Sequence, residues 1–340
     1  MKQVKLIDVA VKAGVSKSTV SQYLNGRYEY MSKDTKEKIK CTIEELNYIP
    51  NSIARSLKTD KTNTIGVIVR DITGFFTSNV LRGIDDYCKK NNYNVLIYNT
   101  DYDPEVEKKS ISILKMLRVD GIIIASSGQN NELLNKENIN GTPIVQMHME
   151  YDNLNISTVL SDYRTGAFNA TEYLINLGHK NIAIITQEYK SIRSRYDRIL
   201  GYQDALIKNG LTVDQNLINV WDRPFGINDS FEALLRSTNP PTAIFTMHSA
   251  ITIDLLNYLN THNINVPEDL SLIGFDELPL ANLLKTPITV VNQSPYEIGE
   301  KSAELLLWKI THKKETLNKK IVLPCELIIR DSCKSLHNSR

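Results

Sequence analysis

The chain has 340 residues, of which 41% are hydrophobic and 23% charged, so it is long enough for two or three domains with apolar cores. The formal net charge of +1 conceals a division: residues 1–62 hold 12 Lys and Arg against 7 Asp and Glu, and the remainder carries a net charge of −4. No run of 18 apolar residues and no signal-peptide pattern is present, so we expect neither membrane insertion nor export, and a location in the cytoplasm.

Three short helices are predicted at the basic N-terminal end. Leu6 to Ala13 has apolar residues at helical spacing, and a second helix follows that Ser16 caps and Gly26 ends. Together they form a helix-turn-helix, and Ser32 caps a third helix that ends near Asn47. The second helix has an apolar face with Val20 and Leu24, and its opposite face is polar: Lys17, Ser18, Ser21 and Gln22. Such a basic module suits contact with a phosphate backbone, although a surface of this composition can equally be only solvated.

The ordered string KLIDVAVKAGVSKSTVSQYLNG, followed by NYIPNSIARSL, resembles the DNA-binding head of the LacI family of bacterial repressors. An unrelated amphipathic module would explain the apolar spacing but not the whole string. The resemblance implies a helix-turn-helix domain over residues 1–50, whose second helix enters the major groove and supplies the contacts Ser16, Lys17, Ser18, Ser21, Gln22 and Asn25. Many relatives carry Arg where this chain has Gln22, and glutamine matches adenine, so we expect an A·T pair in the operator where relatives have G·C.

Residues 51–62 are expected to form a hinge helix and linker. The segment from Asn51 to Lys58 allows only two helical turns, which are marginal in water without a partner. In the LacI family this segment pairs with its twin and inserts a leucine into the minor groove. The resemblance assigns that wedge to Leu57, with Asn51, Ala54 and Arg55 beside it. A linker leucine that packs on the body is the alternative.

From Thr64 onward, short apolar runs alternate with amphipathic helices. This order predicts an α/β fold with parallel sheets covered on both faces. The runs are Ile65 to Val69, Val95 to Tyr98, Gly121 to Ala125, Ile144 to Met147, Ile182 to Thr186, Ala243 to Thr246 and Leu270 to Phe275. The helices between them include Asn79 to Lys90, Glu105 to Leu117, Arg164 to Leu177, Arg198 to Lys208 and Ala250 to Asn260. Two such units side by side create a ligand cleft at the carboxyl ends of their strands.

The segments RGIDD, VDGIII, LGHKNIAII and SLIGFDE resemble the periplasmic-binding-protein-like core of the same family. The resemblance implies an effector-binding and dimerisation core over residues 63–340, built from two doubly wound parallel-sheet subdomains. The N-subdomain is expected at about 63–161 and 290–320, and the C-subdomain at about 162–289 and 321–331.

Eight residues are expected to line the effector cleft: Phe75, Phe76, His148, Arg198, Trp221, His248, Asp276 and Gln293. Arg198 matches an Arg-x-x-Gly-aromatic pattern whose arginine holds the effector in related repressors, and Asp276 matches the ligand-binding aspartate of the family. A salt bridge between these two is the alternative. Phe75 and Phe76 are equally consistent with a cleft wall and with core.

His148 and His248 replace acidic or acceptor residues of many relatives with side chains that can be cationic. Arg193, Arg195 and Arg198 lie near them, so we hypothesise an acidic effector, such as a sugar acid, in place of a neutral hexose. The opening SQYLNGRYEYMS also resembles repressors of the ketodeoxygluconate type, which agrees with this hypothesis.

The resemblance implies a homodimeric repressor of a carbohydrate or sugar-acid catabolic operon, bound to a pseudo-palindromic operator. Effector binding would rearrange the subdomains and melt the hinge, and induction is the commoner mode in the family. A corepressor, or a phosphoprotein partner, is equally allowed by the residues. The alternative from another class is a cytoplasmic sugar-binding or sensing protein whose head contacts proteins.

No catalytic constellation is apparent, since a Gly-x-Ser-x-Gly elbow and a phosphate-binding Gly-rich loop are both missing. We therefore expect a protein that is not an enzyme and uses no cofactor. The four cysteines are far apart and have no histidine at ligand spacing, which predicts thiols and no metal site: Cys41, Cys88, Cys325 and Cys333.

Overall fold

The computed structural model describes residues 4–49, 61–151, 153–190, 192–222, 226–227, 229–312 and 318–337. It divides into two compact units, Met1–Thr62 and Asn63–Arg340, which we call the head and the core. The expected hinge, with Asn51, Ala54, Arg55 and Leu57, lies outside the described residues. Across the described ranges, every helix is too short or too polar to span a lipid bilayer.

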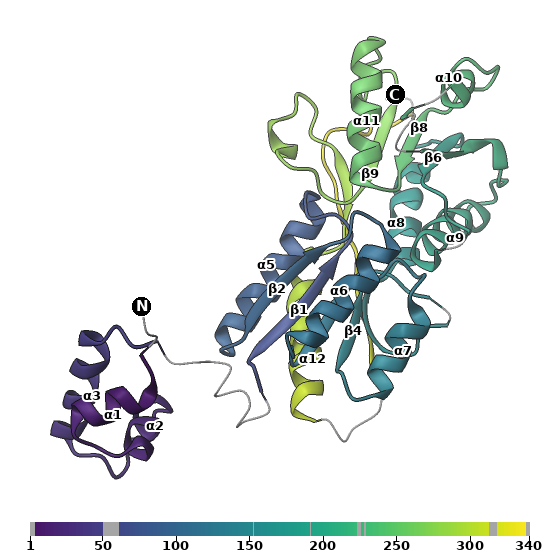
Figure 1. The fold of residues 1–340 in the computed structure, drawn as a ribbon. Coiled ribbons are helices and arrows are strands. Elements are labelled where there is room, and N and C mark those ends of the chain that lie inside the picture. The colour runs from purple at the N-terminus through teal and green to yellow at the C-terminus, as the bar shows by residue number, and fades with distance from the viewer. Residues whose placement is uncertain are drawn as a thin grey trace. The chain divides into compact units, whose positions relative to one another are not determined.

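Within residues 4–49 of the head, the structure describes three helices (Figure 1): α1 (Leu6–Ala13), α2 (Lys17–Leu24) and α3 (Lys33–Glu45). Their apolar faces meet around Val9, Val20 and Ile39, which are fully buried. Each such side chain stabilises the head by about 1.5–3 kcal/mol, so this small core depends on few residues. The predicted helix-turn-helix and the third helix are confirmed.

Local capping determines where α2 begins and ends. The Ser16 hydroxyl oxygen accepts a hydrogen bond from the Thr19 N–H at 3.1 Å, an N-cap that contributes about 1 kcal/mol. Gly26 follows the helix with a φ of +72°, a left-handed conformation that costs glycine little. Both limits agree with the sequence prediction. Ser32 caps α3 in the same way, through the Thr35 N–H at 3.2 Å.

The core contains two six-stranded sheets (Figure 1). The first is parallel throughout, in the order β11-β5-β4-β3-β1-β2, with strands β1 (Thr64–Val69), β2 (Asn94–Asn99), β3 (Gly121–Ile124), β4 (Ile144–Met147), β5 (Ser157–Ser161) and β11 (Lys320–Leu323). The second has the order β12-β10-β9-β8-β6-β7, with strands β6 (Ile182–Thr186), β7 (Ile218–Val220), β8 (Ala243–Thr246), β9 (Ser271–Phe275), β10 (Thr289–Asn292) and β12 (Glu326–Ile328). The predicted fold is confirmed with one correction: β12 pairs antiparallel to β10, so the second sheet is mixed.

Helices cover both faces of each sheet, as buried parallel strands require. On the first sheet, one face packs against α5 (Phe75–Lys90) and α12 (Pro295–Thr311), and the other against α6 (Pro104–Met116) and α7 (Asn131–Ile139). On the second, one face packs against α8 (Tyr163–Asn176) and α9 (Arg193–Lys208), and the other against α10 (Asp229–Leu235) and α11 (Ser249–Thr261). Two short 3-10 turns occur at Gln215–Leu217 and Ala281–Leu283.

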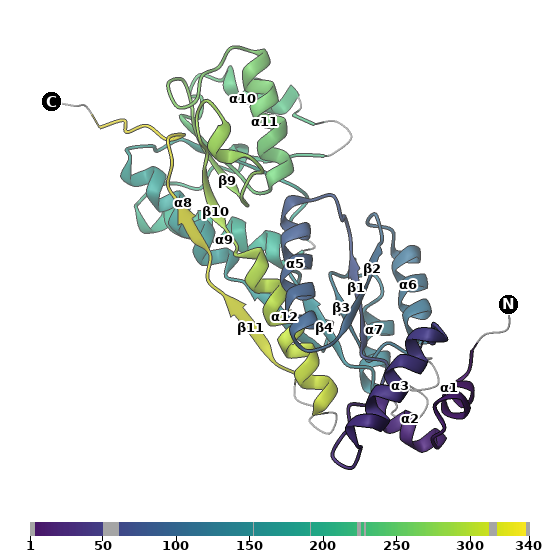
Figure 2. The same ribbon diagram turned by 90° about the vertical axis from the view of Figure 1, so that its left-hand side faces the viewer.

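The chain passes between the sheets after β5, after β10 and after β11. The passages next to β10 and β11 can be followed in Figure 2. The later two crossings therefore lie at 293–294 and 324–325. The boundaries expected between 289 and 290 and between 320 and 321 are corrected, because each would divide a strand. These crossings follow hydrogen-bond pairing between strands, which apolar spacing alone does not reveal.

Candidate functional site

The helix α2 presents a polar face that has few contacts within the head. Lys17, Ser18 and Gln22 are exposed, whereas Val20 is fully buried and Ser21 is half-buried. This arrangement leaves three side chains available to reach a partner along one side of the helix. A short helix with such a face fits the major groove of DNA.

Two of the predicted DNA-binding residues hold the ends of α2. Besides capping the helix, the Ser16 hydroxyl lies 2.6 Å from the Ser18 hydroxyl. The Asn25 amide donates a hydrogen bond to the Ser21 carbonyl at 2.7 Å. Ser16 and Asn25 therefore fix the helix that carries the reading face, and their contact with DNA stays a prediction. The predicted hinge contacts lie outside the described residues.

A cleft with a cavity of about 720 Å³ lies between the two subdomains of the core. A smaller cavity of about 20 Å³ adjoins it and shares Tyr102, Gln187, Arg195 and His248 with it. The walls come from the segments that follow β1, β2, β6, β7 and β8, where parallel strands end. The expected position of the ligand site is therefore matched by a cavity in the core.

Aromatic side chains form part of the wall of the larger cavity. Phe75, at the start of α5, is 39% exposed and lines this cavity, whereas Phe76 packs into the core of the first subdomain. Trp221 also lines it, and its indole N–H donates to a carboxylate oxygen of Asp254 at 2.8 Å. Of the two alternatives, Phe75 is therefore part of the cleft wall and Phe76 is part of the core.

Arg198 lies beneath the smaller cavity and is only 4% exposed. Its guanidinium donates to the Met247 carbonyl and lies 4.0 Å from the centre of the Phe275 ring. Its Nε has no hydrogen-bond partner in the described part of the chain. Gly201 permits this placement, because a Cβ there would lie 2.1 Å from the Arg164 carbonyl oxygen of α8.

Asp276 and Gln293 form a second buried pair, behind the cavities and outside their lining. The Gln293 amide donates to the Asp276 carboxylate, and burial raises the pKa of that carboxyl, an effect that the nearby Arg198 partly offsets. No ion pair joins Arg198 to Asp276 among the described residues, so the salt-bridge alternative is not the arrangement seen. Gln293 follows β10 of the second sheet, not an element of the N-subdomain as expected.

The two histidines, which can be cationic in principle, have different environments. Burial lowers the pKa of His148 well below its usual value, and Arg70 and Arg198 lower it further, so this imidazole is neutral at neutral pH. It packs on Phe76 with ring centroids 4.5 Å apart. The Nδ1 of His248 accepts a hydrogen bond from the Ala250 N–H at 3.1 Å and so caps α11. His148 therefore acts here as a neutral polar group, and the Nδ1 of His248 acts as a hydrogen-bond acceptor.

Two arginines of the smaller cavity were not assigned to the site from the sequence. Arg70 follows β1 and lies 5.3 Å from the centre of the Tyr102 ring, and Arg195 on α9 donates to the Glu188 carbonyl at 2.7 Å. Arg193, the third member of the sequence cluster, pairs with Asp197 at the surface. The rule that ligands meet the ends of parallel strands would have found Arg70, which directly follows a buried strand.

Comparison with known proteins agrees with this combination of head and cleft. A model described as "Bacterial regulatory proteins, lacI family" matches residues 5–51, and one described as "Periplasmic binding protein-like domain" matches residues 171–333. The "Probable HTH-type transcriptional regulator EndR" of Paenibacillus polymyxa is 41% identical over 310 residues, 91% of each chain. The chain belongs to the LacI family. It is a DNA-binding transcriptional regulator with an effector domain.

Two further relatives of this LacI-family regulator span nearly its whole length. The HTH-type transcriptional repressor PurR of Haemophilus influenzae is 32% identical over 337 residues, 97% of this chain and 98% of PurR. The structure of the transcriptional regulator CelR–cellobiose complex has a TM-score of 0.72 at 26% identity, and covers 97% of this chain and all of that one.

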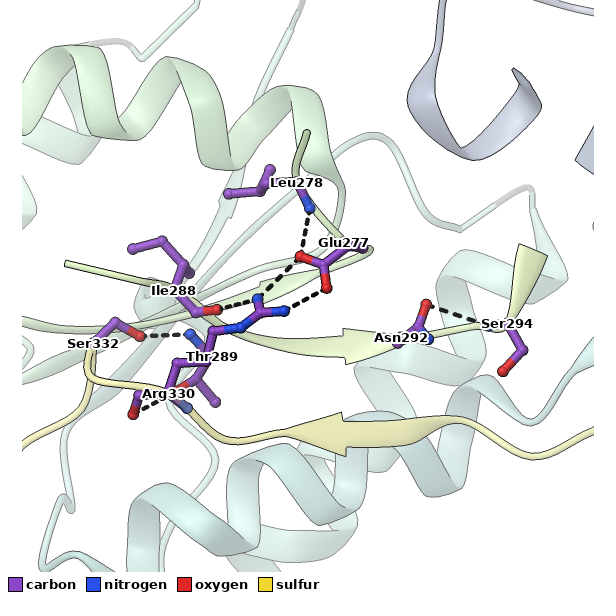
Figure 3. Close-up of polar contacts among 8 residues, drawn as sticks. All are labelled: Glu277, Leu278, Ile288, Thr289, Asn292, Ser294, Arg330 and Ser332. Carbon is purple, nitrogen blue, oxygen red and sulfur yellow. Dashed lines mark hydrogen bonds and ion pairs between the residues drawn. The ribbon is translucent and has the colours of Figure 1, made fainter. Parts of the chain in front are cut away.

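In this LacI-family regulator, Glu277, the residue after Asp276, belongs to a polar frame that joins the segments after β9 and β12 (Figure 3). Arg330 makes two hydrogen bonds to the Glu277 carboxylate, at 3.0 and 2.6 Å, and a third to the Ile288 carbonyl at 2.8 Å. Glu277 also accepts the Leu278 N–H at 3.0 Å. Asp276 itself has a φ of 77°, a conformation that needs such support in a residue other than glycine. The fork between Glu277 and Arg330 supplies it.

Proposed function

We propose that this chain is a repressor of a carbohydrate or sugar-acid catabolic operon, released from its operator by a small molecule bound in the core. The observation that carries the proposal is a single chain with an exposed reading helix in its head and a cavity of about 720 Å³ between two subdomains. The relative PurR, named a repressor, and the cellobiose bound to CelR support both halves of it. Such a regulator acts where its DNA is, in the cytoplasm.

The release mechanism follows from the contribution of both subdomains to the wall of the cleft. Phe75 and Tyr102 belong to the first subdomain, and Trp221 and Arg195 to the second. A ligand that contacts both subdomains binds one relative arrangement of them more tightly and so shifts the population towards it. In a homodimer this change alters the distance between the two hinge segments. The hinge helices, with their Leu57 wedges, then separate and the operator is released.

Each protomer would place one α2 in the major groove of a half-site, and the half-sites of the pseudo-palindrome would lie about one helical turn apart. Lys17, Ser18 and Gln22 would contact base edges or phosphates, and Ser16, Ser21 and Asn25 would orient the helix. Asn51, Ala54 and Arg55 would accompany Leu57 in the minor groove. No chemical step on the effector is part of this proposal.

A gel-shift titration on the DNA upstream of the gene tests the function directly. We expect a shifted complex that a candidate effector dissolves, and loss of the shift on Lys17→Ala/Gln22→Ala, two exposed positions whose replacement leaves the head core intact. A complex that tightens with effector would reverse the sign of regulation to corepression. Absence of any shift, with or without effectors, would favour a sugar-binding protein whose head contacts other proteins.

A further inference from the structure

We propose that the effector is a sugar acid, a polyhydroxylated carboxylate whose carboxylate lies in the smaller cavity against Arg70, Arg195 and Arg198. This inference rests on the proposed function and names the ligand class of the same site. Arg198 belongs to the family pattern noted in the sequence, but Arg70 and Arg195 do not. They make this end of the cleft strongly cationic.

Within the described ranges, the three arginines are not paired with a carboxylate, although Asp276 lies near Arg198 and Glu188 near Arg195. None of them forms an ion pair with an acidic side chain among the described residues, and no Asp or Glu lines the smaller cavity. Arg195 and Arg198 donate hydrogen bonds to backbone carbonyls, and Arg70 lies against an aromatic ring. Burial lowers the pKa of the Arg195 guanidinium to about 10, and the charges of Arg70 and Arg198 add to the effect, although Glu188 partly offsets it.

An unmet hydrogen-bond donor belongs to a residue that lines the same cavity. The Nε of Arg198 is buried and has no partner in the described part of the chain, a state that is unfavourable until a ligand supplies an acceptor. Arginine binds carboxylates through two parallel N–H···O bonds, and its planar guanidinium holds that geometry rigidly. A carboxylate would thus supply acceptors and charge together.

The shape and charge of the cleft define the rest of the ligand. The smaller cavity, about 20 Å³, is too small for a sugar ring, and the adjoining 720 Å³ has room for the body of the ligand. The larger cavity is lined by Asp71, Glu188 and Asp222, whose carboxylates accept hydrogen bonds from hydroxyl groups and repel a second anion. Phe75 and Trp221 offer apolar surfaces to a ring. The cleft is therefore polarised, with one end for an anion and the other for a polyol.

Calorimetric titration of the full-length protein without DNA, using matched sugars, tests this inference. The probes are D-galacturonate against D-galactose, D-glucuronate against D-glucose, and D-gluconate against D-sorbitol, with D-glucose 6-phosphate as the phosphate arm. We expect at least one acid to bind ten or more times tighter than its neutral partner and than the phosphate. A neutral sugar that binds as tightly, a phosphate that binds more tightly, or no binding of any acid at 10 mM would overturn the inference.

Variants connect the affinity to particular side chains. Arg195→Gln should weaken binding of the acid at least tenfold and leave binding of the neutral partner unchanged. Arg193→Gln is the matched control, because it removes the same charge from the same helix at the surface, where Arg193 pairs with Asp197. Equal affinities in the two variants would contradict a role for Arg195.

A second readout needs no ligand. Since Arg70 lies among like charges, Arg70→Gln should leave the melting temperature of the free protein unchanged or raise it, whereas a structural arginine would lower it. Arg82→Gln, an exposed arginine on α5, controls for loss of charge. A melting temperature below that of the control would overturn the inference. Release from DNA by a neutral sugar would overturn the inference of a sugar acid but leave the proposed function standing. Binding of a sugar acid without any DNA binding would support the inference but overturn the proposed function.

Discussion

At the scale of single residues, we predict that Gln22 determines one base pair of the operator that the head recognises. Its side chain is exposed on α2, and a glutamine amide matches the donor and acceptor pattern of adenine in the major groove. We predict that Gln22→Arg changes the preferred base pair at one position of each half-site from A·T to G·C, because arginine pairs with guanine. The discrimination should be about 1–3 kcal/mol.

Selection of binding sites from a random DNA library measures this preference for both proteins. Lys17→Arg, on the same face, keeps the charge and should preserve the wild-type preference at the Gln22 position. An unchanged profile for Gln22→Arg would show that residue 22 does not touch a base.

The sequence indicated several residues that line the cavities, but not the protonation state or the contacts of each side chain. Arg198, Trp221, His248 and Phe75 line the cavities as expected from their places after strands. The neutral form of His148, by contrast, depends on burial against a ring and on arginines from other parts of the chain. Those neighbours come together only in the folded core, so no local sequence pattern predicts them.

At the scale of elements, the fork between Glu277 and Arg330 holds the end of β9 to the segment after β12. The side chains are 23% and 15% exposed, so their charges are largely removed from water. We predict that Arg330→Met destabilises the core by about 2–4 kcal/mol, because it leaves the Glu277 carboxylate and the Ile288 carbonyl without their partner. Urea unfolding followed by circular dichroism measures the loss.

Arg82→Met provides the comparison, since Arg82 is 66% exposed and its pair with Asp86 should be worth less than about 1 kcal/mol. The double variant Glu277→Gln/Arg330→Met should recover part of the stability, because the uncompensated charge is gone. Equal losses in Arg330→Met and Arg82→Met would show that the fork does not hold this part of the core.

Elements that bury a whole apolar face were predicted from the sequence, whereas a strand with buried polar residues was not. The run at β1 and the helical spacing of α11 are visible in the sequence because whole faces of these elements are buried. The strand β5 is not apparent in the sequence because two of its buried residues are serines. Burial of Ser157 is possible because its hydroxyl oxygen accepts hydrogen bonds from Lys309 and from the Lys319 N–H. Pairings between segments distant in the chain, such as β5 with β11, also determine where each subdomain ends.

At the scale of the whole molecule, we expect two histidines, the buried His179 and the half-buried His148, to make the stability of the core depend on pH. His179 is fully buried, with its ring nitrogens 2.8 Å from the Thr242 hydroxyl and 3.1 Å from the Lys334 carbonyl. Burial lowers the pKa of His179, and burial lowers that of His148 further. Both rings are therefore neutral in the folded core at pH values where they would bind a proton in the unfolded chain.

The sign of the effect follows from proton binding. Below the unfolded pKa of about 6.5 the unfolded chain takes up protons that the folded core refuses, so stability falls with decreasing pH. For each histidine the slope approaches about 1.4 kcal/mol per pH unit between its unfolded and folded pKa values. Above pH 7 the two states bind equally few protons at these rings, and the contribution is constant. We therefore predict a lower melting temperature at pH 5.5 than at pH 8.

Melting curves of the wild type, His148→Gln and His179→Gln at pH 8 and pH 5.5 test the assignment. Loss of packing lowers the stability of a variant equally at both pH values. The contribution of proton binding is therefore measured by how much the stability difference between wild type and variant changes from pH 8 to pH 5.5. Because glutamine does not titrate, each variant should lose less stability than the wild type on acidification. The Asp276 carboxyl, whose pKa burial raises, acts in the opposite direction, since it takes up its proton more readily in the folded core. A variant that loses as much stability as the wild type would exclude its histidine as a source of the acid sensitivity.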